Sequence, residues 1–192
     1  MQQTTPERRH YFRVNQDVIF DFKTVDIHTA EQNAPENAIN DGPSMLMLAE
    51  LRRLDRDLQR ISTFLNDKQR LLGDYLQKLN AKIDLIARHS LFASKAEQKT
   101  ARVSIGEGGI AFDSERAIYK GNFLVLQIIF LPSYTPVITF AQVTRCDAAG
   151  STYRIAAEFY RLQDSDRQEL AKHVLKAQVS QRKRGSTSEN NI

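Results

Sequence analysis

Cysteine is nearly absent from this sequence, because Cys146 is the only one among 192 residues. No disulfide can form within the chain, which is typical of proteins from a reducing compartment. Apolar runs are short as well: the longest, Phe123–Leu131, has the length of a strand and not the roughly 18 residues of a membrane helix. The polar and basic start, Met1–Arg9, lacks the apolar core of a secretory signal. We therefore expect a cytoplasmic protein without a membrane span.

Patterns of metal ligands and catalytic groups are also missing. The chain has four histidines, His10, His28, His89 and His173. Their spacing does not match that of metal ligands, and the single cysteine adds nothing to them. We expect no enzyme activity, no metal and no cofactor. The formal net charge of +4 comes partly from Arg182–Arg184, which we interpret as a solvated tail and not as a nucleic-acid site.

Proline and glycine are scarce in one long stretch. Ser44–Phe92 contains no proline and only one glycine, Gly73, and its apolar residues recur at spacings of three and four. These residues are Leu51, Leu54, Leu58, Ile61 and Leu65, then Leu72, Leu76, Leu79, Ile83 and Ile86. Such spacing places side chains along one seam of a helix, the pattern of a coiled coil. At 1.5 Å per residue the helix would be roughly 70 Å long.

The seam favours association with other copies of the chain over folding back on the chain's own domain. The apolar stripe is narrow, and the opposite face of the helix is heavily charged. Leucine dominates both seam positions, which by itself leaves dimer, trimer and tetramer open. We expect Ser44–Phe92 to be an oligomerisation device.

The rest of the chain has the composition of short strands bounded by turn residues. One strand, Val14–Val25, comes before the helix. Five come after it: Ala101–Ile105, Gly109–Asp113, Phe123–Leu131, Val137–Cys146 and Thr152–Tyr160. Because a lone strand leaves its backbone groups unpaired, we expect the first strand to join the later five in one antiparallel barrel that the helix interrupts. A second helix is expected from Ser165 to about Gln181.

These elements divide the chain into six segments. They are a basic arm with the first strand (1–28), a linker (29–43), an inserted coiled-coil helix (44–93), the remainder of the barrel (94–162), a C-terminal helix (163–182) and a disordered tail (183–192). The fold class is α+β, with a six-stranded antiparallel barrel, a long inserted helix and a C-terminal helix.

Two short motifs lie beside the first two strands of the predicted barrel. Arg9 and Arg13 form an Arg-x-x-x-Arg pair before the first strand, and Val103–Phe112 joins two strands through a glycine-rich turn. This combination resembles the PilZ family, six-stranded barrels that bind cyclic di-GMP and carry RxxxR followed by [D/N]xSxxG at a strand junction. The resemblance covers Arg8 to about Tyr160 apart from the linker and the long helix. It implies a cyclic di-GMP site made by Arg8, Arg9, Arg13, Ser104 and Gly109.

The second motif departs from the family pattern. With Gly109 as its last glycine, Ser104 stands where Asp or Asn is expected, and Gly106 where Ser is expected. Arginine pairs with phosphate or with guanine O6 and N7, but guanine N1 and N2 need an acceptor. Losing two polar contacts costs on the order of 1–3 kcal/mol each. In an alternative alignment Ser104 is the motif serine, and Arg102 occupies the acidic position.

Two functions are consistent with these observations. The first is a PilZ-like signalling or adaptor protein that binds cyclic di-GMP and oligomerises through its coiled-coil stalk. The second is a degenerate PilZ scaffold that does not bind the nucleotide and acts as an oligomeric interaction module. The resemblance to family members with an inserted heptad helix favours a tetramer through Ser44–Phe92. Either function calls for a downstream protein partner.

Overall fold

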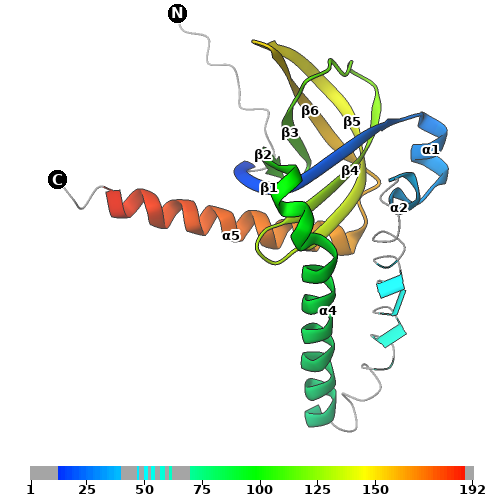
Figure 1. Ribbon diagram of the computed structural model, residues 1–192, viewed down its shortest axis with the longest axis vertical. Coiled ribbons are helices and arrows are strands. Elements are labelled where there is room, and N and C mark those ends of the chain that lie inside the picture. The colour runs from blue at the N-terminus through cyan, green and yellow to red at the C-terminus, as the bar shows by residue number, and fades with distance from the viewer. Residues whose placement is uncertain are drawn as a thin grey trace, which may run out of the picture.

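The computed structural model describes residues 13–39 and 70–188, together with eight positions between Met47 and Ile61. For residues 93–99 and 181–188 the description covers the backbone alone. Figure 1 shows a barrel from which one long helix projects downwards and a second helix projects sideways. Among the described residues, no helix has both the length and the apolar character needed to cross a membrane.

The predicted barrel is confirmed. Its strands are β1 (Arg13–Val25), β2 (Thr100–Gly106), β3 (Gly109–Ser114), β4 (Phe123–Phe130), β5 (Thr135–Ala149) and β6 (Thr152–Tyr160). They close in the order β1-β2-β3-β6-β5-β4, and every neighbouring pair is antiparallel. The strand before the helix therefore pairs with both β2 and β4. Closure removes the free strand edges that an open sheet would expose.

Strand β4 explains why one segment of the sequence is apolar without alternation. All of its residues are buried. Leu124, Leu126 and Ile128 belong to the cluster inside the barrel, whereas Val125 and Ile129 belong to a second cluster on the outside. A strand covered on both faces has no solvent side on which polar residues would be favoured.

Two short helices occupy the segment that the sequence predicts as a linker, which is a correction. They are α1 (Ile27–Gln32) and α2 (Pro35–Ala38). Asp26 caps α1 by accepting a hydrogen bond from the Thr29 amide at 2.8 Å, and Pro35 opens α2. Both helices pack on the outer face of β4 and β5, where Ala30 is fully buried. Apolar coverage of the barrel thus starts before the long helix does.

The long helix is α4 (Arg70–Lys99). It leads directly into β2 at Thr100, so the predicted helix end at residue 93 is six residues too early. The eight described positions between Met47 and Ile61 are also helical, while residues 62–69, across which the sequence predicts one continuous helix, lie outside the described part. Only the C-terminal part of α4 is anchored: Phe92 is fully buried, and Arg88 donates to the Thr135 hydroxyl at 3.1 Å.

The C-terminal helix α5 (Asp164–Ser188) packs its first turns against the barrel through Leu170 and Val174. The ring of His173 stacks on Phe130 with 4.2 Å between centroids. The helix runs to Ser188, so the prediction of a disordered tail from residue 183 is wrong for residues 183–188. Residues 189–192 lie outside the described part of the chain.

Candidate ligand-binding site

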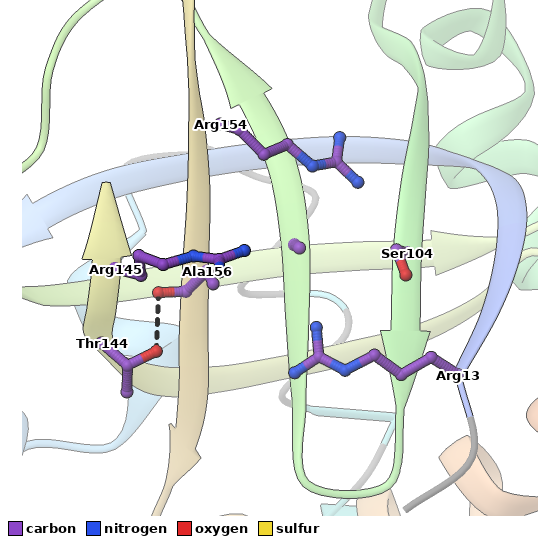
Figure 2. Close-up of a pocket in the computed structure, with 7 residues that line it drawn as sticks. Arg13, Ser104, Thr144, Arg145, Arg154 and Ala156 are labelled. Atoms are coloured by element: carbon purple, nitrogen blue, oxygen red, sulfur yellow. Dashed lines mark hydrogen bonds between the residues drawn. The ribbon is translucent and has the colours of Figure 1, made fainter. Parts of the chain in front are cut away.

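A hollow of about 380 Å³ lies on the outer face of the barrel. It is lined by Arg13, Ser104, Ala111, Thr144, Arg145, Arg154 and Ala156, and these residues are called the hollow below. They come from five of the six strands, β1, β2, β3, β5 and β6. In Figure 2 the guanidinium groups of Arg13, Arg145 and Arg154 point toward the middle of this face. Its volume is at the lower end of the range for small-molecule sites.

Arg13 and Ser104, two of the residues that the sequence predicts for the site, meet in this hollow. The antiparallel register pairs Arg13 with Gly106 and Asn15 with Ser104, so Arg13 lies one residue pair away from Ser104 along the two strands. Val14 is buried in the barrel, and alternation along β1 therefore turns Arg13 outward. The other two predicted arginines, Arg8 and Arg9, lie outside the described residues.

Gly109, the remaining predicted site residue, lies outside the hollow. It is the first residue of β3 and pairs with Gly106 on β2 and with Glu158 on β6. A Cβ atom at this position would overlap the carbonyl oxygen of Ala157 and would lie 3.2 Å from the Glu158 Cα atom. The close approach of β3 and β6 therefore requires glycine here for a structural reason, independent of any ligand.

The floor of the hollow consists of small side chains. Ser104 pairs with Ala111 across β2 and β3, and Ala111 pairs with Ala156 across β3 and β6. These three neighbours form a row across the barrel face. Because none of them extends beyond a hydroxyl or methyl group, the longer arginine side chains stand above the floor and the space between them stays open.

A β-bulge in β5 brings two further residues to the hollow. The register of β5 against β6 shifts between Val143, which pairs with Ala157, and Arg145, which pairs with Ala156. Thr144 is the extra residue, and its hydroxyl donates to the carbonyl oxygen of Ala156 at 3.1 Å. In a regular strand Val143 and Arg145 would share one face, but the bulge reverses the alternation. Val143 is buried in the barrel, whereas Arg145 turns outward into the hollow.

Two carboxylates hold the arginines of the β5–β6 hairpin at the rim of the hollow. Arg154 pairs with Asp113 at 3.0 Å, and Arg145 pairs with Asp147 at 2.8 Å. Each guanidinium has five N–H donors and therefore retains donors for a further acceptor. With three guanidiniums and two carboxylates, the site carries an excess of positive charge, which suits an anionic ligand. No cluster of His, Cys, Asp and Glu that could hold a metal ion occurs in the described parts of the chain.

Thr144, Arg145, Arg154 and the alanines of the floor are site residues that the sequence reasoning missed. Arg154 could have been found, because it occupies an outward position of an alternating strand. Arg145 could not, since regular alternation places it on the same face as Val143 and only the bulge exposes it.

Comparison with solved structures identifies the architecture. A PilZ-domain protein from Xanthomonas campestris, a tetramer self-assembled via a helical bundle, matches 90% of this chain over 89% of its own length, with a TM-score of 0.51 and 17% sequence identity. The chain has a PilZ-like fold. The match extends beyond the barrel, since it covers nearly all of both chains.

Two shorter matches are also PilZ-related or have motility-related names. The PilZ domain of YcgR from Escherichia coli, solved with c-di-GMP, has 16% identity and a TM-score of 0.35 over 47% of this chain and 82% of that one. MotI/DgrA, an inhibitor of motility from Bacillus subtilis, has 25% identity and a TM-score of 0.36 over 43% of this chain and 44% of that one. No protein-family model and no curated protein matches the sequence.

Proposed function

We propose that this PilZ-like protein is a cyclic di-GMP-binding adaptor that oligomerises through its helical stalk. The observation that carries the proposal is the meeting of Arg13 with Ser104 in one hollow on the barrel face. These are the residues that the family resemblance assigns to the ligand, and the fold brings them together from segments separated by the whole stalk. A neighbour of the same architecture, the PilZ domain of YcgR, is a complex with c-di-GMP.

The chemistry of the hollow agrees with a cyclic dinucleotide. Such a ligand presents two phosphates and the acceptor atoms O6 and N7 of guanine. Arginine recognises both groups with its planar fork of donors, and Arg13, Arg145 and Arg154 converge on this face. A shallow hollow at the surface of a rigid barrel holds these donors in place before the ligand arrives, which reduces the entropy cost of binding.

Calorimetric titration of the full chain with cyclic di-GMP tests the proposal. Arg13→Ala is expected to weaken binding roughly 10- to 100-fold, because it removes charge-assisted hydrogen bonds. Arg167→Ala is the matched control, since Arg167 is an exposed arginine on α5 outside the hollow. No heat from the wild-type chain at millimolar ligand, or equal affinity of Arg13→Ala and the control, refutes nucleotide binding at this site.

The stalk supports self-association because its apolar seam is exposed in the single chain. Leu72, Leu76, Leu79, Ile83 and Ile86 of α4 are between 41% and 69% exposed. Leu71, Tyr75 and Leu85 are exposed beside them, so the apolar surface is wider than a two-stranded seam. A broader stripe is typical of helices that contact more than one partner helix. The Xanthomonas campestris neighbour is a tetramer assembled via a helical bundle, and we propose the same form here.

Light scattering on the full chain measures the oligomer number. The double variant Leu79→Ser with Ile83→Ser is expected to lower the mass to that of a smaller oligomer or monomer, because it replaces two seam residues in one helical turn. Lys78→Ser with Lys82→Ser is the matched control on the charged face and is expected to keep the wild-type mass. A wild-type chain that is monomeric at micromolar concentration contradicts the proposed role of the stalk.

The second candidate is a scaffold that assembles through the stalk without binding the nucleotide. The observation that favours it is the pair Ser104 and Gly106, which offers neither the carboxylate nor the amide that the motif of the family supplies. The same titration separates the two candidates, because the scaffold predicts the wild-type oligomer mass together with no heat from cyclic di-GMP.

A further inference from the structure

The β5–β6 hairpin contributes two arginines to the hollow that the family motif does not include. Arg145 follows the bulge of β5, and Arg154 lies on β6 opposite Asp113. Figure 2 shows Arg145 reaching from β5 past Ala156 and Arg154 reaching across β3 toward the Ser104 side. Arg13 approaches the same space from β1. The hollow is therefore enclosed by guanidinium groups from two opposite sides of the barrel face.

The lining of the hollow is rich in donors and poor in acceptors. Among the described residues that line it, three are arginines and the only polar others are Ser104 and Thr144. The Thr144 hydroxyl already donates its proton to the Ala156 carbonyl oxygen. Asp113 and Asp147 lie at the rim and are engaged with Arg154 and Arg145. A phosphate needs only donors, whereas the N1 and N2 hydrogens of guanine need an acceptor such as a carboxylate.

We propose that Arg145 and Arg154 bind the phosphates of a cyclic dinucleotide, and that the site accepts adenine as well as guanine bases. The inference rests on the proposed function and deepens it by assigning the ligand class. Arg13 and the hairpin arginines hold the two phosphates from opposite sides, and the small floor of Ser104, Ala111 and Ala156 leaves room for a base of either kind. Purine N7 is an acceptor in both guanine and adenine, so the remaining arginine donors find a partner in either ligand.

Calorimetry on the full chain with two probes, cyclic di-GMP and cyclic di-AMP, tests this inference. The wild-type chain is expected to bind both with affinities within about tenfold of each other. Arg145→Ala and Arg154→Ala are each expected to weaken both ligands by about 10- to 100-fold, because each removes a charged donor from a phosphate. Arg167→Ala again serves as the control for a lost surface charge and is expected to bind both ligands like the wild type.

A third variant separates the role of the arginine from that of its carboxylate partner. Asp113→Asn releases Arg154 from its ion pair and is expected to leave the affinity for both ligands unchanged or increased. If Asp113→Asn abolishes cyclic di-GMP binding alone, the carboxylate is the guanine acceptor, and the inference that the site tolerates either base is overturned.

The remaining outcomes distinguish the failure of this inference from the failure of the proposed function. Binding of cyclic di-GMP with more than a hundredfold preference over cyclic di-AMP, or hairpin variants that bind like the control, overturns the inference and leaves the receptor function standing. Absence of heat with either probe overturns both. Weaker binding of both ligands to both hairpin variants, with the control unchanged, supports the inference.

Discussion

Replacing Gly109 by alanine tests the close approach of β3 and β6 that shapes this barrel. The added methyl group would overlap the backbone carbonyl oxygen of Ala157 and press on the Glu158 Cα atom at 3.2 Å. Neither contact can be relieved by rotating a side chain, because both partners are backbone atoms of the paired strand β6. The strands must separate locally, which strains the pairing from Gly109 to Ile110 and Ala157.

The expected loss follows from the cost of inserting a methylene-sized group into a packed site, about 1–3 kcal/mol and occasionally more. For a chain of this size each kcal/mol lowers the melting temperature by roughly 2–4 °C, so the melting temperature should fall by about 2–12 °C. Amide protons of β3 and β6 should also exchange faster, since the strain is located in their shared ladder.

Gly150→Ala is the control for substituting a glycine. Gly150 is at the tip of the β5–β6 hairpin with φ of +67°, and an added Cβ meets nothing within 4 Å. Its cost is backbone strain alone, about 1–2 kcal/mol, and amide exchange in β3 should stay slow. If Gly109→Ala melts like the wild type and keeps full protection in β3 and β6, the structural explanation of this glycine is refuted. A ligand contact would then have to explain it.

Two further predictions concern the junctions between helices and barrel. Phe92→Ala should destabilise the protein by about 3–5 kcal/mol, because Phe92 is fully buried on the barrel; chemical denaturation measures this, and an unchanged midpoint would show that α4 is not anchored there. Burial against Phe130 lowers the pKa of His173 below its usual 6.5, so the unfolded chain binds the proton more readily. Stability should therefore be full above pH 6.5 and fall as the pH drops below it. This fall should be smaller in His173→Phe than in His28→Phe, an exposed control, and equal slopes would contradict the assignment.

Most of the barrel could be predicted because strands and turns leave a local record. Alternating apolar residues bounded by glycine, proline and aspartate mark each strand, and the unpaired first strand had to find partners in the later sheet. The structure confirms this closure, with β1 between β2 and β4. The boundaries were less accurate: β5 extends from Thr135 to Ala149, beyond the predicted segment at both ends.

The linker and the end of the long helix could not be predicted because tertiary contacts decide them. Helix α1 is shorter than the roughly 12 residues that an isolated helix needs in water, and it is stable because Ala30 packs on β4 and Arg161 binds the carbonyl of Ala30. Helix α4 continues to Lys99 although the composition changes after Phe92. Burial of Phe92 on the barrel orients the helix so that it passes directly into β2.

The candidate site was predicted in part. The arginine before the first strand and the serine near the glycine turn do line one hollow, because their positions in register follow from a regular hairpin. Gly109 was predicted as a ligand residue, and the structure gives its glycine a packing reason. The two arginines of the hairpin were missed, since one of them depends on a bulge that no residue pattern in β5 marks.

By itself the sequence determined the elements, their closure into one barrel and the apolar stripe of the stalk, because periodicity and turn chemistry are local properties of the chain. Only the tertiary structure decided which charged side chains share a surface. That choice depends on strand register, and a single extra residue in a strand turns every later side chain to the opposite face. The hollow with Arg13, Arg145 and Arg154 exists because Thr144 is that extra residue.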